Sequence, residues 1–161
     1  GHVPRARRDT DEGIRLLKIA TWNVNGIRAR QAQLEAWAEA TQPDLICLQE
    51  IKASPEQLGL LAELAGYWCY WHGAKGYSGV GLLVSERVAA ERPAFAHPPF
   101  DFEHRIVTVR LPAFTLASVY VPNGGKDFAA KLEFLTALGH DVEIAVRQSR
   151  KEHGEMSVTL R

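Results

Sequence analysis

A strand–helix–strand pattern near the N-terminus constrains the fold of this chain more than any other feature. Residues 15–23 are typical of a strand, and the polar residues and Gly26 that follow indicate a loop. Pro43 ends a helix, and the mostly apolar residues 44–50 are typical of a buried strand. A unit of about 35 residues predicts two parallel neighbouring strands and hence an α/β fold. The helix shows an apolar stripe at helical spacing: Leu34, Trp37, Ala38 and Thr41.

Two polar side chains stand where these predicted strands end. Asn23 comes at the end of the first strand, and Glu50 comes at the end of the second. Parallel neighbouring strands place their carboxyl ends at the same edge of a sheet, and open α/β sheets bind ligands outside that edge. We therefore expect Asn23 and Glu50 to lie side by side in one site.

A second helix and a hairpin are predicted from the middle of the chain. Ser54 stands directly before a proline and three residues before Gln57, which is the pattern of a helix N-terminus with a capping box. Residues 67–72 and 80–84 are typical of strands and flank the turn-rich residues 73–79. We expect a hairpin with a seven-residue tip.

The later part of the chain predicts another hairpin, a helix and one more strand. A Pro-rich link over residues 93–99 precedes two alternating segments, 105–110 and 115–121, that predict paired strands. The apolar positions from 128 to 146 trace one face of a helix. Residues 157–160 are typical of the start of a strand.

Composition places the chain among compact globular domains. It has 161 residues, of which 46% are hydrophobic and 24% are charged, enough to bury a core. Residues 1–14 are charged and lack periodicity, so we expect a solvated tail there and one domain over residues 15–161. Because 19 Lys and Arg balance 19 Asp and Glu, any contact with nucleic acid depends on a local patch.

The cysteines and the hydropathy pattern predict a cytoplasmic protein without membrane contact. Cys47 and Cys69 lie in apolar runs without metal-ligand spacing, which favours buried free thiols over a disulfide or a zinc site. The sequence contains no run of ~18 apolar residues and no signal peptide. Four histidines also lack metal-ligand spacing and are interpreted as structural or surface residues: His72, His97, His104 and His140.

Four motifs occur in order along the chain: Ala20-Thr-Trp-Asn-Val-Asn-Gly-Ile-Arg28, Pro43-Asp-Leu-Ile-Cys-Leu-Gln-Glu-Ile-Lys52, His72-Gly-Ala-Lys-Gly-Tyr-Ser-Gly-Val80 and Val119-Tyr-Val-Pro-Asn-Gly124. Together they resemble the exonuclease III family of apurinic/apyrimidinic endonucleases, within the DNase I-like endonuclease/exonuclease/phosphatase group. The resemblance implies part of a four-layer α/β/β/α sandwich with mixed sheets flanked by helices, in which each half of the chain contributes mainly one sheet.

The same resemblance implies a DNA-repair nuclease that hydrolyses phosphodiesters 5′ to abasic sites and from 3′ ends. Such hydrolysis needs a hard cation, an activated water and donors for the charge on the phosphate oxygens. Glu50 matches the family's ligand for Mg²⁺, for which Mn²⁺ is an alternative, and Asn23 matches the asparagine that organises the metal and phosphate site. Tyr120 matches the tyrosine near the scissile phosphate, which donates to an oxygen or, with a lowered pKa, assists proton transfer. By residue type alone, Glu50 equally suits an exposed strand end, Asn23 equally suits a turn, and Tyr120 equally suits a core position.

Several polar or basic residues are candidates for contacts with double-stranded DNA. Contacts to phosphates position a duplex without reading its sequence. Asn123 equally suits a turn, and for each basic residue a solvated side chain is the alternative. The candidates are Arg28, Lys75, Tyr77, Ser78, Arg105 and Asn123.

Two later motifs of the family, Gly-Asp-x-Asn and Ser-Asp-His, do not occur in these 161 residues, and residues 141–161 depart from the family pattern. We therefore expect the N-terminal part of such an enzyme, poorly active alone because catalytic residues act as a unit. An uncovered inner sheet face would favour self-association. The alternatives are another phosphodiesterase or phosphatase of the group, acting on phosphoinositides, sphingomyelin or nucleotides, and a non-catalytic chain that binds DNA or a partner.

Overall fold

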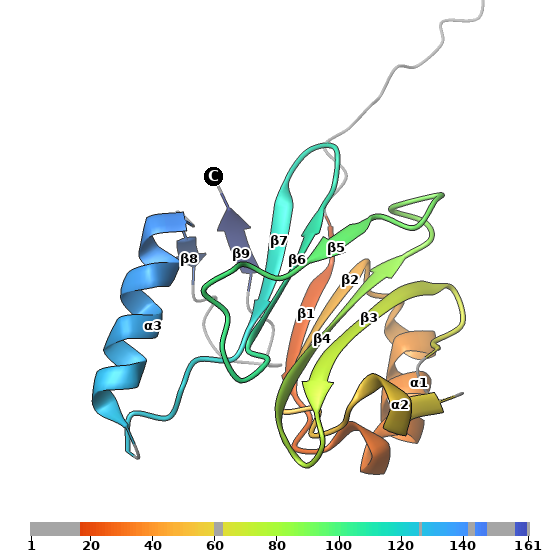
Figure 1. The fold of residues 1–161 in the computed structure, drawn as a ribbon. Helices are drawn as coiled ribbons and strands as arrows, with labels where there is room; N and C mark the ends of the chain where they lie inside the picture. The colour runs from red at the N-terminus through yellow and green to blue at the C-terminus, as the bar shows by residue number, and fades with distance from the viewer. Residues whose placement is uncertain (1–16, 60–62, 126, 142–143, 148–156, 161) are drawn as a thin grey trace, which may run out of the picture.

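The computed structural model describes residues 17–59, 63–125, 127–141, 144–147 and 157–160, so the predicted tail over residues 1–14 lies outside the described residues. Its strands form a four-stranded sheet, a three-stranded sheet and a two-stranded sheet. Figure 1 shows α1 and α2 on one side of the larger sheet and α3 on the opposite side of the molecule.

Sheet A has the order β1-β2-β4-β3 and contains the predicted strand–helix–strand unit. β1 (Ile19–Asn23) pairs in parallel with β2 (Leu45–Gln49), and α1 (Gln31–Thr41) connects them. The helix ends where Gln42 adopts a left-handed conformation, with φ 49°, and donates its N–H to the carbonyl of Ala38 at 2.9 Å. Both the parallel pairing and the helix were predicted and are confirmed.

The short helix α2 (Pro55–Leu58) begins with the predicted capping box. The backbone N–H of Gln57 donates to Ser54 Oγ at 3.4 Å, and the Gln57 side chain accepts from the Ser54 N–H at 3.0 Å. This reciprocal pair satisfies two donors that a helix start leaves unpaired.

The predicted hairpin is present, but its tip is shorter than expected. β3 (Tyr67–Ala74) and β4 (Tyr77–Ser85) pair antiparallel nearly to their ends, so the turn consists of Lys75 and Gly76 alone. Two glycines that looked like turn residues lie within the strands, because the segment after β2 passes close to them. A Cβ on Gly73 would clash with the Ala53 carbonyl, and one on Gly79 would meet Ile51 at 2.6 Å.

Sheet B contains the second predicted hairpin and one strand that was not predicted. β6 (Ile106–Arg110) pairs antiparallel with β7 (Thr115–Val119), as expected. β5 (Ala94–Ala96) lies within the Pro-rich link and pairs with β6 at the edge of the sheet. The prolines around a three-residue edge strand hid it, because so short a segment carries no alternation of its own.

The chain after α3 (Phe128–Asp141) also differs from the prediction. The helix ends at Asp141, and β8 (Ile144–Arg147) pairs antiparallel with β9 (Ser157–Leu160) where a continued helix had been expected. The strand at residues 157–160 was predicted and is confirmed. The apolar positions of so short a segment fit helical spacing and strand spacing equally well, and the pairing between β8 and β9 decides for a strand.

Two sheets packed face to face form the centre of the molecule. A buried cluster between them joins Leu45 and Val84 of sheet A to Val107 and Leu116 of sheet B, which also bury Cys47. The expectation that the inner face of the first sheet is uncovered was therefore wrong. Strands β5 to β7 belong to the same half of the family pattern and cover that face themselves.

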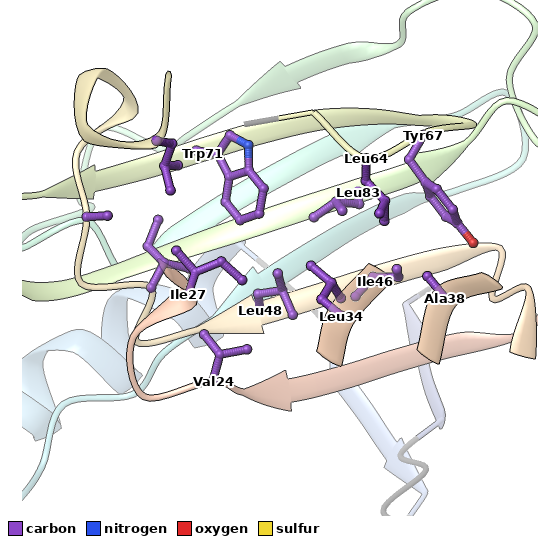
Figure 2. Packing of buried hydrophobic residues seen from close by; sticks show 13 residues of the cluster. Val24, Ile27, Leu34, Ala38, Ile46, Leu48, Leu64, Tyr67, Trp71 and Leu83 are labelled. Carbon is purple, nitrogen blue, oxygen red and sulfur yellow. The ribbon is translucent and has the colours of Figure 1, made fainter. Parts of the chain in front are cut away.

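Helices cover the outer faces of both sheets and complete the four layers that were predicted. Leu34 and Ala38 of α1 face Ile46 and Leu48 of β2, as Figure 2 shows. On the other side, Phe134 of α3 packs in a smaller cluster on sheet B. No helix among the described residues is long and apolar enough to cross a membrane.

Both cysteines are free, as predicted from their spacing. Burial raises the pKa of Cys47 to about 12 and that of the partly buried Cys69 to about 11. Because the thiolate is the reactive form, both side chains behave as small apolar residues of the core.

The core assignment predicts how two leucines differ. Leu48 is fully buried, whereas Leu132 on α3 is 49% exposed. Leu48→Ala leaves a cavity and should lower the free energy of unfolding by about 2–5 kcal/mol. Leu132→Ala removes the same atoms from the surface and should change it by less than about 0.5 kcal/mol. Urea denaturation followed by tryptophan fluorescence measures both, and equal losses would contradict this packing.

Candidate active site

The site lies at the edge of sheet A where β1 and β2 end. Asn23 is the last residue of β1 and pairs with Gln49, the residue before Glu50. Backbone hydrogen bonds continue past the strands, from the Gly26 N–H to the Glu50 carbonyl at 2.8 Å and from the Ile27 N–H to the Ile51 carbonyl at 3.0 Å. The two loops are therefore held together, and the predicted proximity of Asn23 and Glu50 is confirmed.

The carboxylate of Glu50 accepts hydrogen bonds from both sheets. Asn23 Nδ2 donates to Glu50 Oε1 at 2.9 Å, and the Tyr120 hydroxyl, which follows β7, donates to the same oxygen at 2.8 Å. The other oxygen, Oε2, lies 3.5 Å from Lys52 Nζ. Three side chains from three different segments thus orient one carboxylate whose side chain keeps 22% of its surface exposed.

These contacts separate the protonation states of the acid and the phenol. The hydrogen bonds from Asn23 and Tyr120 and the charge of Lys52 hold the pKa of Glu50 below its ordinary value. Burial, followed by the hydrogen bond to Glu50, raises the pKa of Tyr120 above its ordinary value. At neutral pH the site contains an ionised carboxylate and a neutral phenol. This favours Tyr120 as a hydrogen-bond donor over the proton-transfer role that a lowered pKa would allow.

Lys52 was not singled out from the sequence, although it lies two residues after Glu50. Its Nζ donates to Asn25 Oδ1 at 2.6 Å as well as approaching Glu50. Asn25 has φ 45° and donates its backbone N–H to Asn23 Oδ1 at 3.1 Å, so it forms a turn. The turn and the lysine together fix the side-chain amide of Asn23 with its Nδ2 toward Glu50.

Arg105 supports Tyr120 from sheet B. Its guanidinium lies 4.9 Å from the centre of the Tyr120 ring, and its Nη1 donates to the Tyr120 carbonyl at 3.3 Å. The residue is only 4% exposed, and its Nη2 lies 2.6 Å from Glu103 Oε2. Arg105 was proposed from the sequence as a DNA contact, but its burial and ion pair favour a role in positioning Tyr120.

The hairpin tip presents some of the other proposed DNA contacts and buries one. Lys75 and Tyr77 are exposed, and the Tyr77 hydroxyl lies 3.5 Å from both Glu103 and Arg105. Ser78 is 2% exposed, and its hydroxyl has no hydrogen-bond partner among the described residues. Burial argues against direct contact between Ser78 and DNA.

Two further candidates lie in loops and are exposed. Arg28 belongs to a short 3₁₀ helix, η1 (Ile27–Ala29), directly after the loop that follows β1. Asn123 accepts the Gly125 N–H at 2.9 Å in a turn after β7. Both loops leave strands that end at the site, and the turn role of Asn123 does not prevent its nitrogen from facing solvent.

The donor set around Glu50 suits a hard cation held largely by water. Within the described part of the chain, no group of three or more His, Cys, Asp or Glu side chains is arranged to hold a metal ion. Mg²⁺ is commonly bound by one or two carboxylates while it keeps several waters. The ionised, partly exposed Glu50 fits that mode, whereas Asn23 directs its Nδ2 to Glu50 and its Oδ1 to the Asn25 N–H.

Three of the histidines that were interpreted as structural or surface residues form a cluster. The rings of His72, His97 and His104 lie together, with centroid distances of 4.1 Å and 4.7 Å from His72. Asp101 lies beside them, 2.5 Å from His72 Nε2. Sequence spacing contains no signal for this cluster, because its members come from β3 and from the link between β5 and β6.

Comparison with known proteins identifies the class. Residues 20–154 match the sequence model of the endonuclease/exonuclease/phosphatase family, and the chain belongs to that family. Within it, the exodeoxyribonuclease III of Haemophilus influenzae is 34% identical over 154 residues, which cover 89% of this chain and 55% of that protein. The resemblance to exonuclease III-type enzymes is thus confirmed for the N-terminal portion of those proteins.

Solved structures show the same relationship. An AP endonuclease from Archaeoglobus fulgidus has a TM-score of 0.64 at 30% identity, covering 78% of this chain and 50% of its own. A 3′-5′ exonuclease from Neisseria meningitidis has a TM-score of 0.64 at 28% identity, covering 77% and 50%. The chain spans about half the length of these relatives.

The hydrogen bonds to Glu50 predict an order of pKa changes. Removing either donor should raise the pKa of Glu50 toward its ordinary value, and Asn23→Ala should raise it more than Tyr120→Phe because Asn23 makes the larger contribution. Since the folded pKa is depressed, Glu50 stabilises the fold above the pKa of an unfolded glutamate, and this contribution is lost as pH falls through the folded pKa. Carbon-detected NMR titration of the Glu50 carboxyl measures the shifts. A lower pKa in either variant would contradict the hydrogen-bond assignment.

Proposed function

We propose that this chain carries the first half of the active site of a Mg²⁺-dependent DNA-repair nuclease, which cleaves 5′ to abasic sites and removes nucleotides from 3′ ends. The observation that carries the proposal is the Glu50 carboxylate, held ionised at the edge of sheet A by Asn23 and Tyr120. The family membership and the exonuclease III-type relatives support it.

Each site residue has a role in this proposal. Glu50 would hold Mg²⁺, with Mn²⁺ as an alternative. Asn23, the other proposed ligand, would have to turn its amide oxygen from the Asn25 N–H toward the ion. A bound divalent cation neutralises phosphate charge and lowers the pKa of its water. The phenol of Tyr120 donates its one O–H to Glu50 in the free chain and would donate it to a phosphate oxygen when substrate binds. Lys52 adds positive charge beside the same carboxylate.

The proposed contacts with double-stranded DNA are the exposed side chains around this edge. Arg28 lies directly after β1, Lys75 and Tyr77 lie at the hairpin tip, and Asn123 lies after β7. They contribute two cations and two neutral donors from three segments of the chain. Such contacts bind the phosphate backbone without selecting a sequence, which suits an enzyme that acts on lesions and strand ends.

The catalytic prediction concerns nicking of a duplex that carries one abasic site. The 161-residue chain should nick slowly if at all, because Gly-Asp-x-Asn and Ser-Asp-His do not occur in it. A chimera that follows α3 with the second half of an exonuclease III-type relative, chosen to carry both motifs, should nick in Mg²⁺ but not in EDTA. In the chimera, Glu50→Gln should lower the rate by at least about 100-fold and Tyr120→Phe by about 10- to 100-fold.

Glu39→Gln on the exposed face of α1 is the matched control for Glu50→Gln and should leave the rate unchanged. Circular dichroism and thermal melting establish that each protein is folded. A folded chimera that leaves abasic DNA intact, or that nicks equally well after Glu50→Gln, would overturn the proposal. Salt-dependent binding without any cleavage would favour the non-catalytic alternative.

The binding prediction concerns the basic side chains at the edge. Lys75→Ala and Arg28→Ala should each weaken binding to duplexes of any sequence and lower the slope of log affinity against log salt by about 1. Lys18→Ala, at the opposite end of sheet A, is the matched control and should change neither quantity. Fluorescence anisotropy over a salt series measures both, and an equal effect of all three substitutions would place the DNA elsewhere.

A further inference from the structure

Three histidine side chains lie together in a cluster that has no role in the proposed reaction. His72 and His97 are stacked, with ring centroids 4.1 Å apart and planes within 10° of each other. His104 tilts against His72 at a centroid distance of 4.7 Å. His97 is exposed and His104 is partly exposed, so the cluster is open to solvent at one side.

The cluster lies at the same edge as Glu50. His72 pairs with Val80, and Val80 pairs with Gln49, the residue before Glu50. On the other side, Asp101 Oδ1 accepts the backbone N–H of Arg105 at 2.8 Å, and Arg105 packs on Tyr120. A continuous series of contacts therefore connects the histidines to the carboxylate of the candidate active site.

Metal binding does not explain the cluster. A cation needs lone pairs that converge on one point, whereas the nearly parallel rings of His72 and His97 direct their in-plane lone pairs along separate planes. The described histidines and Asp101 do not form a group able to hold a metal ion.

Of the two acids on the link beside the cluster, only Asp101 is directed at an imidazole. Asp101 contacts His72 through Oδ2 and accepts two backbone N–H groups through Oδ1, from Arg105 and Ile106. Glu103, on the same link, forms an ion pair with Arg105 at 2.6 Å. Asp101 is thus the carboxylate that the described residues place against His72, and a phosphate would add negative charge beside His97 and His104.

We propose that His72, His97 and His104 form a subsite for a phosphate of the DNA backbone, adjacent to the phosphate that is cleaved, and that binding is accompanied by proton uptake. This inference rests on the proposed function, because it assigns a further part of the DNA to the same edge. His97 and His104 contact the phosphate oxygens, and the partly buried pair of His72 and Asp101 orients the stack.

The sign of the pH dependence follows from His104. Burial, followed by the nearby His72, lowers the pKa of His104 below its ordinary value, so this imidazole is neutral in the free protein at neutral pH. A phosphate raises the pKa because the opposite charge favours the protonated form. DNA therefore binds more tightly as pH falls through the range in which histidine titrates.

The test uses the whole chain and a Cy3-labelled duplex that carries an abasic-site analogue, in EDTA so that the duplex stays intact. From about pH 6 to about pH 8, the dissociation constant should rise roughly three- to tenfold. The double substitution His97→Gln and His104→Gln should reduce that rise to less than about twofold, while it leaves the His72–Asp101 pair in place. Lys75→Gln is the matched control: it should weaken binding at every pH and keep the rise.

Two further measurements separate the possible sources of the phosphate and of the protons. Calorimetry in buffers of different ionisation enthalpy should show protons taken up on binding by the native chain and fewer by the double variant. Inorganic phosphate is the second probe, and the NMR signals of His97 and His104 should respond to it only at concentrations far above those needed for the duplex.

Each outcome has a definite meaning. Loss of the pH dependence in the double variant, with the Lys75→Gln control unchanged in slope, supports the subsite. Binding to the duplex that is independent of pH, or a pH dependence that survives in the double variant, overturns the subsite and leaves the proposed function standing. Preference for inorganic phosphate also overturns the assignment to DNA. The absence of duplex binding at any pH overturns both proposals.

Discussion

The hydrogen bond from Tyr120 to Glu50 joins the two sheets at the point where the candidate site lies. Tyr120 follows β7 of sheet B, and Glu50 follows β2 of sheet A, 70 residues earlier in the chain. A second bond between the sheets, from Ser118 Oγ to the Leu48 carbonyl at 3.3 Å, lies two residues before each of them. Because a hydrogen bond tolerates little variation in length, the packing between the sheets determines the geometry of the site.

The apolar cluster between the sheets therefore serves both stability and chemistry. Buried side chains such as Cys47 and Val107 hold the two faces at a fixed separation, and the polar residues lie just beyond the ends of the strands. The charges at this edge are arranged in the same way. Arg105, ion-paired with Glu103, supports the phenol, while Lys52 and Asn23 support the carboxylate. Glu50 and Tyr120 thus each have partners that fix the position and the protonation state of the side chain.

The sequence predicted the parts of this structure that depend on local patterns. The parallel pairing of β1 and β2 follows from a strand, a helix and a strand within one short unit, and the capping box at Ser54 follows from neighbouring residues. The predictions that failed were those for which two patterns compete. The Pro-rich edge strand β5 and the strand β8 are each stabilised by pairing with the strand that follows, and neither has a distinctive local signal.

Among the site residues, the sequence by itself determined that Asn23 and Glu50 meet, because strand order and direction place the ends of parallel neighbours together. It also contains the motifs that assign the chain to its family. Tertiary structure alone decided that Arg105 and Ser78 are buried, that Lys52 reaches both Asn25 and Glu50, and that three histidines stack beside Asp101. The physical reason is that burial, ion pairing and ring stacking depend on contacts between segments far apart in the chain, whereas residue spacing reports only on segments that fold locally.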